Sequence, residues 1–326
     1  MLTYLLRRIL YAIPILIGVN LVTFALFFLI NTPDGMARSI LGDKRVDQAM
    51  IDQWKAERGY HLPRLWNGAA GGTARVTETI FWKKCMPLFA LEFGRSDLDN
   101  HDVGEAIAAR IGPSLAITLP MFLISLVVNV FLAMLVAFHR GTYIDLAGLV
   151  LCVVLMSISV LFYIIGGQFV FAKLLHLFPI SGYDAGWGGL KFLLMPIVIG
   201  FLASLGGNVR YDRTVFLEEI NKDYVRTARA KGLPERTVLF RHALKNAMIP
   251  ILTSVVVTIP FLIMGNLLLE NFFAIPGLGS YVIDAIQKQD FAVVRAMVYL
   301  GSVLYIGGLL LVDVSYTLVD PRVRLG

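Results

Sequence analysis

Long apolar runs alternate with polar connections along this chain. An α-helix rises about 1.5 Å per residue, so roughly 20 apolar residues cross a hydrocarbon core of about 30 Å. Lipid cannot satisfy the open edge of a sheet, whereas a helix satisfies its own backbone. The pattern therefore predicts an all-α integral membrane protein with six transmembrane helices. We place them at 9–30, 114–138, 146–172, 192–209, 247–269 and 292–316.

The first run resembles a secretory signal peptide because Arg7 and Arg8 precede it. The apolar part of such a peptide holds only about 7–15 residues, and the run at 9–30 is longer. We therefore expect a first helix that is retained in the membrane. The pattern divides the chain into three parts: the N-terminus with the first helix (1–30), a loop region (31–113) and a core (114–326).

Composition supports a membrane protein, and the basic residues predict its orientation. The chain is 57% hydrophobic and 16% charged, against about 45–50% and 25% in soluble domains. Lys and Arg mark the cytoplasmic side of membrane proteins. They precede the first run, follow the second, fill 210–246 and recur at Arg322 and Arg324. With six spans these positions share one side, so both termini are predicted to be cytoplasmic and the loop region at 31–113 extracytoplasmic.

The same distribution bears on partners and on the loop region. Because the basic residues flank apolar runs and do not gather on a soluble domain, we expect no nucleic-acid partner. Within the loop region, the spacing predicts a helix over 46–60 and an amphipathic helix over 101–115 that leads into the second span. The Gly- and Ala-rich stretch at 67–75 is expected to be flexible.

The segment 210–246 has the most distinctive pattern in the chain. It carries nine Lys and Arg residues, and burying each in the bilayer would cost roughly 3 kcal/mol, so the segment lies outside the membrane. Gly232 suits a left-handed position after a helix, and Pro234 suits the first turn of the next one. This order of helix, break and helix predicts a rigid elbow of two helices. The small side chain of Ala228 would leave the first helix narrow enough for another surface to approach it closely.

Three interpretations of this elbow (residues 210–246) remain open at this point. It is a solvated basic loop or one that touches anionic lipid, a docking element for a partner protein, or the gating loop of a channel. A simple topology loop needs neither a helix nor a Gly-x-Pro break, which favours docking.

At these residues the sequence resembles a known family. The motif RTARAKG at 226–232 with HAL at 242–244 is similar to the signature loop of bacterial ATP-binding-cassette (ABC) importer permeases of the dipeptide, oligopeptide and nickel group. The outer segment with its PGLG turn at 271–294 resembles the same group. The chain departs from it at 157–163, where members usually have a proline, and at 66–86, which resembles an insertion.

The resemblance implies a type I importer-like permease bundle and a function. The chain would be the transmembrane permease subunit that takes up short peptides or related small solutes through a bacterial inner membrane. Its implied partners are a second homologous permease chain, two ATP-binding cassette ATPase subunits, an extracytoplasmic solute-binding protein and membrane lipid.

Two sets of site residues follow. The ATPase-coupling elbow would act through Tyr224, Arg226, Thr227, Ala228, Arg229, Lys231, Gly232, Pro234 and Arg236. Polar residues within spans tend to face a bundle interior or a water-filled path. The candidates for such a path are Asn129, Gln168, Asn208 and Asn266. The alternative for each is an interhelical hydrogen bond. Glu270 and Asp313 lie near the ends of spans, where we expect them to face headgroup water.

Motifs for enzymatic chemistry are absent from the sequence. It has no phosphate-binding Gly-x-x-x-x-Gly-Lys-Ser/Thr, no His-Glu-x-x-His and no Gly-x-Ser-x-Gly. We therefore predict no enzyme and no catalytic, cofactor-binding or metal residue, and we expect ATP and Mg²⁺ on partner ATPase subunits. The rival hypothesis is a secondary transporter or channel that works without an ATPase. It predicts inverted repeats and discontinuous helices, and the sequence shows no repeat.

Overall fold

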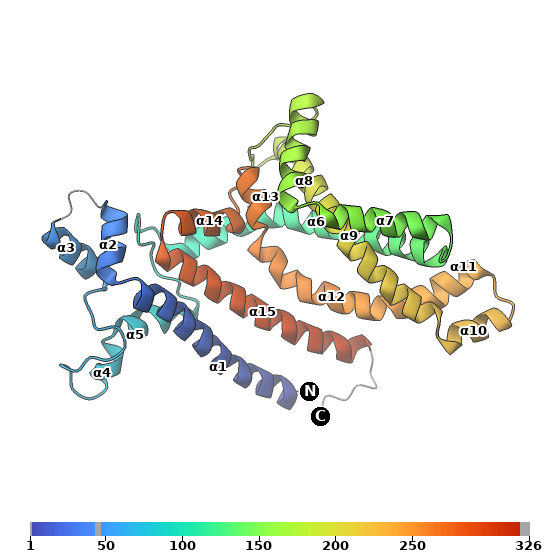
Figure 1. The fold of residues 1–326 in the computed structure, drawn as a ribbon. Helices are drawn as coiled ribbons and strands as arrows, with labels where there is room; N and C mark the ends of the chain where they lie inside the picture. Colours follow the sequence, from blue (N-terminus) through green and yellow to red (C-terminus); the bar gives the residue numbers. More distant parts are fainter. Residues whose placement is uncertain (1, 43–46, 320–326) are drawn as a thin grey trace. The chain divides into compact units, whose positions relative to one another are not determined.

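The structure is a computed structural model that describes residues 2–42 and 47–319. Arg322 and Arg324, which carry the prediction of a cytoplasmic C-terminus, lie outside the described residues. Over the described ranges the regular structure is helical (Figure 1), apart from one isolated bridge between Arg95 and Asp102. The predicted all-α fold class is confirmed.

Helices long and apolar enough to span a membrane occur near the predicted positions. In the described part of the chain five helical segments meet these criteria without a sharp bend: Leu6–Phe28, Val103–Phe138, Leu190–Ile220, Glu235–Phe272 and Phe291–Ser315. A sixth span is formed if the bent pair Tyr143–Ser157 and Val160–Leu174 counts as one. Length and composition thus agree with five or six spans.

The third predicted span, 146–172, is not one straight helix. It divides into α7 (Tyr143–Ser157) and α8 (Val160–Gly167), and the chain bends by 88° between them. Ile158 and Ser159 have extended backbones, and the Ser157 hydroxyl donates to the carbonyl of Val153. Serine hydroxyls compete with the helical ladder in this way and favour bends. The Tyr163 hydroxyl donates to the Leu155 carbonyl at 2.8 Å, which satisfies an oxygen left free where α7 ends.

The described residues form two compact units, and helices α6 (Val103–Phe138) and α15 (Phe291–Val319) contribute to both. Unit 1 holds the residues up to Ile111 and Ser280–Leu310. Unit 2 holds Gly112–Gly279 and, among the described residues, 311–319. The predicted division of the chain at residues 30 and 113 stays a prediction.

Unit 1 is built on the first helix and the loop region. Its elements besides parts of α6 and α15 are α1 (Leu2–Ala25), η1 (Leu26–Ile30), α2 (Pro33–Leu41), α3 (Gln48–Arg58), α4 (Ala74–Thr77), α5 (Ile80–Cys85), η2 (Pro87–Ala90) and most of α14 (Leu278–Gln287). Its core packs Phe24 and Phe28 against Ile51 and Tyr60. The segment 66–86 takes part in this core through its buried Ile80 and Cys85.

Unit 1 contains both helices that the sequence predicts in the loop region. The helix expected over 46–60 is confirmed as α3, which begins after an Asp47 cap and ends at the left-handed Gly59. The helix expected over 101–115 is confirmed as the beginning of α6, which continues without interruption through Pro113. The stretch at 67–75 forms hydrogen-bonded turns, with Asn67 N donating to the Arg75 carbonyl at 2.9 Å.

Unit 2 holds the remaining elements. They are α7 and α8, η3 (Gln168–Leu174), η4 (Trp187–Gly189), α9 (Leu190–Ile220), α10 (Asp223–Ala230), α11 (Glu235–Thr237), η5 (Val238–Ala243), α12 (Leu244–Met264) and α13 (Leu267–Phe272). Helices α7 and α9 pack closely because Gly206 has no side chain. A Cβ there would lie 2.6 Å from the Cys152 carbonyl oxygen. Along the chain, α9 and α12 are connected by α10, α11 and η5, which lie within the elbow.

Candidate functional site

The elbow turns through a glycine-ended helix, as the sequence predicts. Gly232 has a φ of +77°, its N–H donates to the Arg229 carbonyl at 2.9 Å, and Leu233 N donates to the Ala228 carbonyl at 3.4 Å. These two bonds are those of a Schellman motif, which satisfies carbonyls left free at a helix end. Pro234 caps the next helix from the position just before its first turn, one residue earlier than predicted.

An ion pair closes the turn from the outside. The Arg229 Nε donates to both carboxylate oxygens of Glu235 at 3.1 Å, and Nη2 also reaches Oε1. The two residues lie on opposite sides of the Gly232–Pro234 turn. This bidentate contact, the Arg229–Glu235 fork, therefore holds the angle between the two arms of the elbow, which are α10 before the turn and α11 with η5 after it. The sequence predicts that Arg229 acts on a partner ATPase, and it does not identify Glu235. The pair could have been predicted from the spacing, since Glu235 begins one helix six positions after Arg229 in the last turn of the other.

Ala228 has a different role from the one expected. It is buried, with 5% exposure, and packs with Val225 and Val238 in a small apolar cluster bordered by Tyr224. The small side chain therefore allows the two arms of the elbow to approach each other. It does not present a thin surface to a partner, because the cluster faces inward.

Within the elbow, a buried carboxylate at the end of α9 binds the first turn of α10. Glu219 is 7% exposed and accepts hydrogen bonds from the Tyr224 hydroxyl at 2.6 Å and from Lys222 Nζ. Burial, followed by the hydrogen bond to Glu219, raises the pKa of Tyr224 to about 12, so this hydroxyl keeps its proton at physiological pH. Glu219 is a second structural residue that the sequence did not single out.

The outer surface of the elbow is cationic. Lys231 and Arg236 are exposed and form no ion pair with any residue that the structure describes. The Arg226 side chain is 71% exposed and lies 3.5 Å from Asp223, and the Thr227 hydroxyl donates to its own helix. The elbow thus has an apolar interior, an ion-paired turn and free positive charges outside.

Unit 2 also contains a cavity of about 410 Å³ between α6, α9 and α12. Two of the four predicted path residues, Asn129 and Asn208, line it. Other lining residues include Tyr211 and Asp212 on α9 and Ser254 on α12. Both arms of the elbow therefore continue into helices that form the walls of this cavity.

The other two predicted path residues support the backbone. Gln168 Nε2 donates to the carbonyls of Ile180 and Phe272 at 3.2 and 3.1 Å. The Asn266 side chain caps α13 by accepting from Leu269 N at 3.0 Å. The Gln168 bond to Phe272 joins two helices, as the interhelical alternative describes, whereas the Asn266 bond caps its own helix. Neither residue lines the cavity of Asn129 and Asn208.

The expectation that Glu270 faces headgroup water is wrong. Glu270 is fully buried, and its Oε1 accepts from the Ser114 hydroxyl at 2.8 Å and from Asn266 N at 3.1 Å. Ser114 in turn accepts from Leu278 N at 2.8 Å. Hydrogen bonds to the carboxylate offset the cost of removing it from water. Asp313 is also buried, with 9% exposure.

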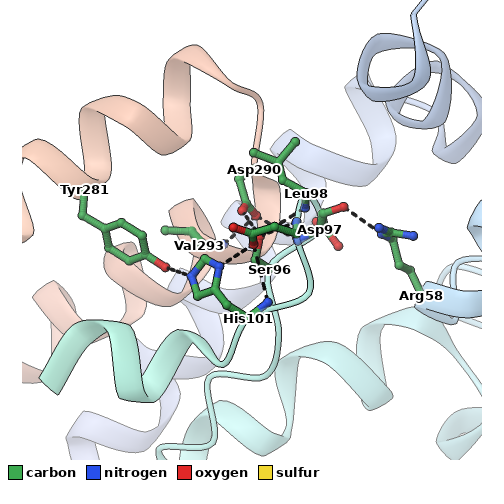
Figure 2. A network of polar contacts seen from close by, with 9 residues as sticks. Arg58, Ser96, Asp97, Leu98, His101, Tyr281, Asp290 and Val293 are labelled. Carbon is green, nitrogen blue, oxygen red and sulfur yellow. Dashed lines mark hydrogen bonds and ion pairs between the residues drawn. The ribbon is translucent and has the colours of Figure 1, made fainter. Parts of the chain in front are cut away.

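A polar network organises unit 1 (Figure 2). The Asp97 carboxylate accepts from the Tyr60 hydroxyl at 2.8 Å and from Ala292 N at 3.1 Å. Asp290 accepts from the Ser96 hydroxyl and from Asp97 N. Burial raises the pKa of the Asp97 carboxyl, although nearby Arg295 opposes the shift. These bonds join the segment before α6 to the start of α15.

A second part of the network continues toward α14. His101 Nε2 lies 2.8 Å from the Tyr281 hydroxyl, as Figure 2 shows. The Nδ1 atom of His101 contacts Asp99. The Arg110 guanidinium lies 4.5 Å from the centre of the Tyr281 ring. Among the described residues no group of His, Cys, Asp and Glu is arranged to hold a metal ion.

Comparison with known proteins decides the family. Residues 129–325 match the model of the binding-protein-dependent transport system inner membrane component family, which covers more than half of the chain. The chain belongs to this family. The resemblance carried by 226–232 and 242–244 is thereby confirmed, and the protein is a multi-pass inner-membrane permease of an ABC importer.

Curated relatives match this permease over nearly its whole length. It is 32% identical to a putative peptide transport system permease of Brucella abortus, over 98% of both chains. It is 28% identical to an oligopeptide transport system permease of Bacillus subtilis, over 99% of this chain and all of the other. It is 30% identical to a glutathione transport system permease of Salmonella paratyphi A, over 99% of both.

Proposed function

We propose that this permease takes up short peptides or related small solutes, and that the elbow couples this uptake to an ATPase. The observation that carries the proposal is the elbow itself. Its turn is fixed by the Gly232 geometry and by the Arg229–Glu235 pair, and its outer face is cationic. A rigid projection transmits force without bending, and this chain has no phosphate-binding loop of its own.

The assembly we propose contains more than this chain. A second homologous permease would complete the pathway, two ATPase subunits would bind ATP and Mg²⁺, and an extracytoplasmic protein would deliver the solute. The termini and the elbow would face the cytoplasm, since Lys and Arg gather there. Lys231 and Arg236 would contact acidic groups or helix C-termini on the ATPase.

The mechanism follows the connectivity of unit 2. Movement of an ATPase would displace the elbow, and the Glu219–Tyr224 bond would carry the displacement into α9. The other arm continues through η5 into α12. Both helices line the cavity of Asn129 and Asn208, so a shift at the elbow changes the shape of the cavity. This is how the permease would alternate the access of a solute.

The names of the relatives support peptides as the substrate class. They include permeases for peptides, oligopeptides, dipeptides and glutathione, all of which carry a peptide backbone or a related amide. The polar lining of the cavity, with amides and hydroxyls, fits solutes of this kind.

The test is uptake of radiolabelled Ala-Ala into vesicles that contain the complete importer. We expect accumulation only when ATP and the ATPase subunits are present and the binding protein is supplied outside. Uptake by the permease alone, without an ATPase, would establish the secondary transporter or channel instead.

A further inference from the structure

One side chain gives the cavity of unit 2 its charge. Asp212 on α9 is 7% exposed and is the single charged residue in the lining, which contains no Lys, Arg or His. Over the described ranges it forms no ion pair. The neighbouring Arg213 is bound to Asp145, with Nη2 at 2.6 Å from Oδ1. An ionised carboxylate in so buried a place is costly unless a cation joins it.

A second polar side chain of the lining belongs to another helix. Asn129 on α6 is 3% exposed, and its buried Oδ1 has no hydrogen-bond partner in the described structure. Two hydroxyls of the lining are already used as donors within α12. Ser254 donates to the Ile251 carbonyl at 2.7 Å, and Thr258 donates to the Ser254 carbonyl at 2.9 Å. The wall therefore combines an uncompensated carboxylate with an uncompensated amide oxygen.

The remaining lining suits the body of a small organic solute. Phe122, Leu126, Ile251 and Val255 form its apolar part, and the volume of about 410 Å³ lies within the range of small-molecule sites. A divalent metal ion does not fit this wall, since Ca²⁺ takes six to eight oxygen ligands and usually several carboxylates. An anion would be repelled by Asp212.

We infer that this cavity binds the ammonium group of the transported solute, with Asp212 as its counter-ion and Asn129 as a second acceptor. An ammonium has three donors and no acceptor, so two acceptors from different helices can each bind one of its donors. The chemical class is a short peptide with a free amino group. The inference rests on the proposed uptake of peptides and adds to it a site of charge selection inside the permease.

The site also belongs to the moving part of the protein. Asp212 lines the cavity and lies on the same helix, α9, as Glu219, which accepts the hydrogen bond from Tyr224 of α10. Asn129 lies on α6, outside the two helices that the elbow joins. A displacement of α9 changes the distance between the two acceptors, so the ammonium would be held in one state of the permease and released in another.

The test measures binding by the importer without its solute-binding protein, so that the binding protein's own selection is removed. The complex of permease and ATPase chains is placed in nanodiscs, and the affinity for Ala-Ala-Ala is compared with that for N-acetyl-Ala-Ala-Ala. We expect the wild type to prefer the free ammonium at least tenfold, and Asp212→Asn to reduce this preference to twofold or less. Asp212→Glu should restore part of it, and Asp52→Asn, exposed in unit 1, should leave it unchanged.

Each other result contradicts the inference. The inference would be overturned if Asp212→Asn preferred Ala-Ala-Ala over its N-acetyl form as strongly as the wild type does. It would also be overturned if the wild type showed no such preference. If Asp212→Asn loses the second permease chain, a basic residue of that chain is the partner of Asp212, and the inference fails. Should that variant not fold, Asn129→Ala takes its place: a preference reduced three- to fivefold supports the site, and an unchanged one refutes it. ATP-driven Ala-Ala uptake by the wild type, measured beside these variants, shows separately whether the proposed function holds.

Discussion

The guanidinium of Arg229 binds both carboxylate oxygens of Glu235 across the Gly232–Pro234 turn. These side chains are 41% and 40% exposed, and exposed pairs of this kind stabilise a protein by about 1 kcal/mol or less. The pair therefore contributes little to the folding of unit 2. Its geometry matters more, because it is the one ion pair described across the turn of the elbow.

We expect Glu235→Gln to separate coupling from stability. Loss of the fork should leave the melting temperature within about 2 °C, since the energy is small, and should lower the uptake of solute per ATP hydrolysed by a factor of about 3 or more. The measurement is the ratio of the two rates in vesicles that hold the complete importer. Asp223→Asn is the matched control, because it removes an exposed partner of Arg226 that does not cross the turn. An unchanged ratio in Glu235→Gln would remove the fork from the coupling mechanism.

Tyr224 should stabilise the elbow in a pH-dependent way. Its hydroxyl donates to buried Glu219, and a hydrogen bond to a charged group contributes about 1.5–3 kcal/mol. We expect Tyr224→Phe to lower the free energy of unfolding by an amount in this range at pH 7. Because burial raises the pKa of Tyr224 from 10 to about 12, this contribution is complete below pH 10 and is lost as the pH rises through 12.

The measurement for Tyr224 is the difference in thermal stability between wild type and variant from pH 7 to 11. The difference should be constant up to pH 9 and should narrow above pH 10. A difference that grows at alkaline pH would contradict the assignment, and Tyr211→Phe serves as a half-exposed control on α9.

The pair of Asp145 and Arg213 should be a stability element of unit 2. Both side chains are nearly buried, with exposures of 10% and 14%, and Nη2 lies 2.6 Å from Oδ1. Removal of one partner leaves a buried charge, which costs roughly 3–5 kcal/mol in well-buried pairs. We expect about 2–4 kcal/mol for Asp145→Ala. The double variant with Arg213→Met should be less destabilised than either single change, as a thermal-unfolding cycle measures; additive effects would show that the pair is not coupled.

Much of this fold follows from local patterns. The runs of apolar residues predict the spanning helices, and Asp47 and Gly59 at the two ends of α3 act as helix caps commonly do. The Gly232 turn is predictable for the same reason, since its conformation depends on its own backbone and on nearby residues. The bend after Ser157 is harder to predict, because it interrupts an apolar run whose composition alone favours one continuous helix.

The contacts between distant segments could not be predicted from one sequence. Ser114 and Glu270 are separated by 156 positions, yet they share a hydrogen bond, and nothing in the composition near either residue identifies the other. Ala228 illustrates the same limit at short range: its size indicates close packing, but the packing partner turned out to be Val238 of the same elbow. Asp212 stands out only once α6, α9 and α12 surround it.

The most direct measurement of the central claim is the transport of Ala-Ala per ATP hydrolysed by an importer with Gly232→Val. Gly232 has a φ of +77° with open space around it, so valine strains the turn without a clash. We predict that the complex still assembles and hydrolyses ATP while the transport ratio falls at least tenfold; Gly18→Val, at a helical glycine that also has open space around it, should leave the ratio unchanged. A Gly232→Val importer that transports with the wild-type ratio would contradict the account, because force would then reach the cavity without a rigid elbow.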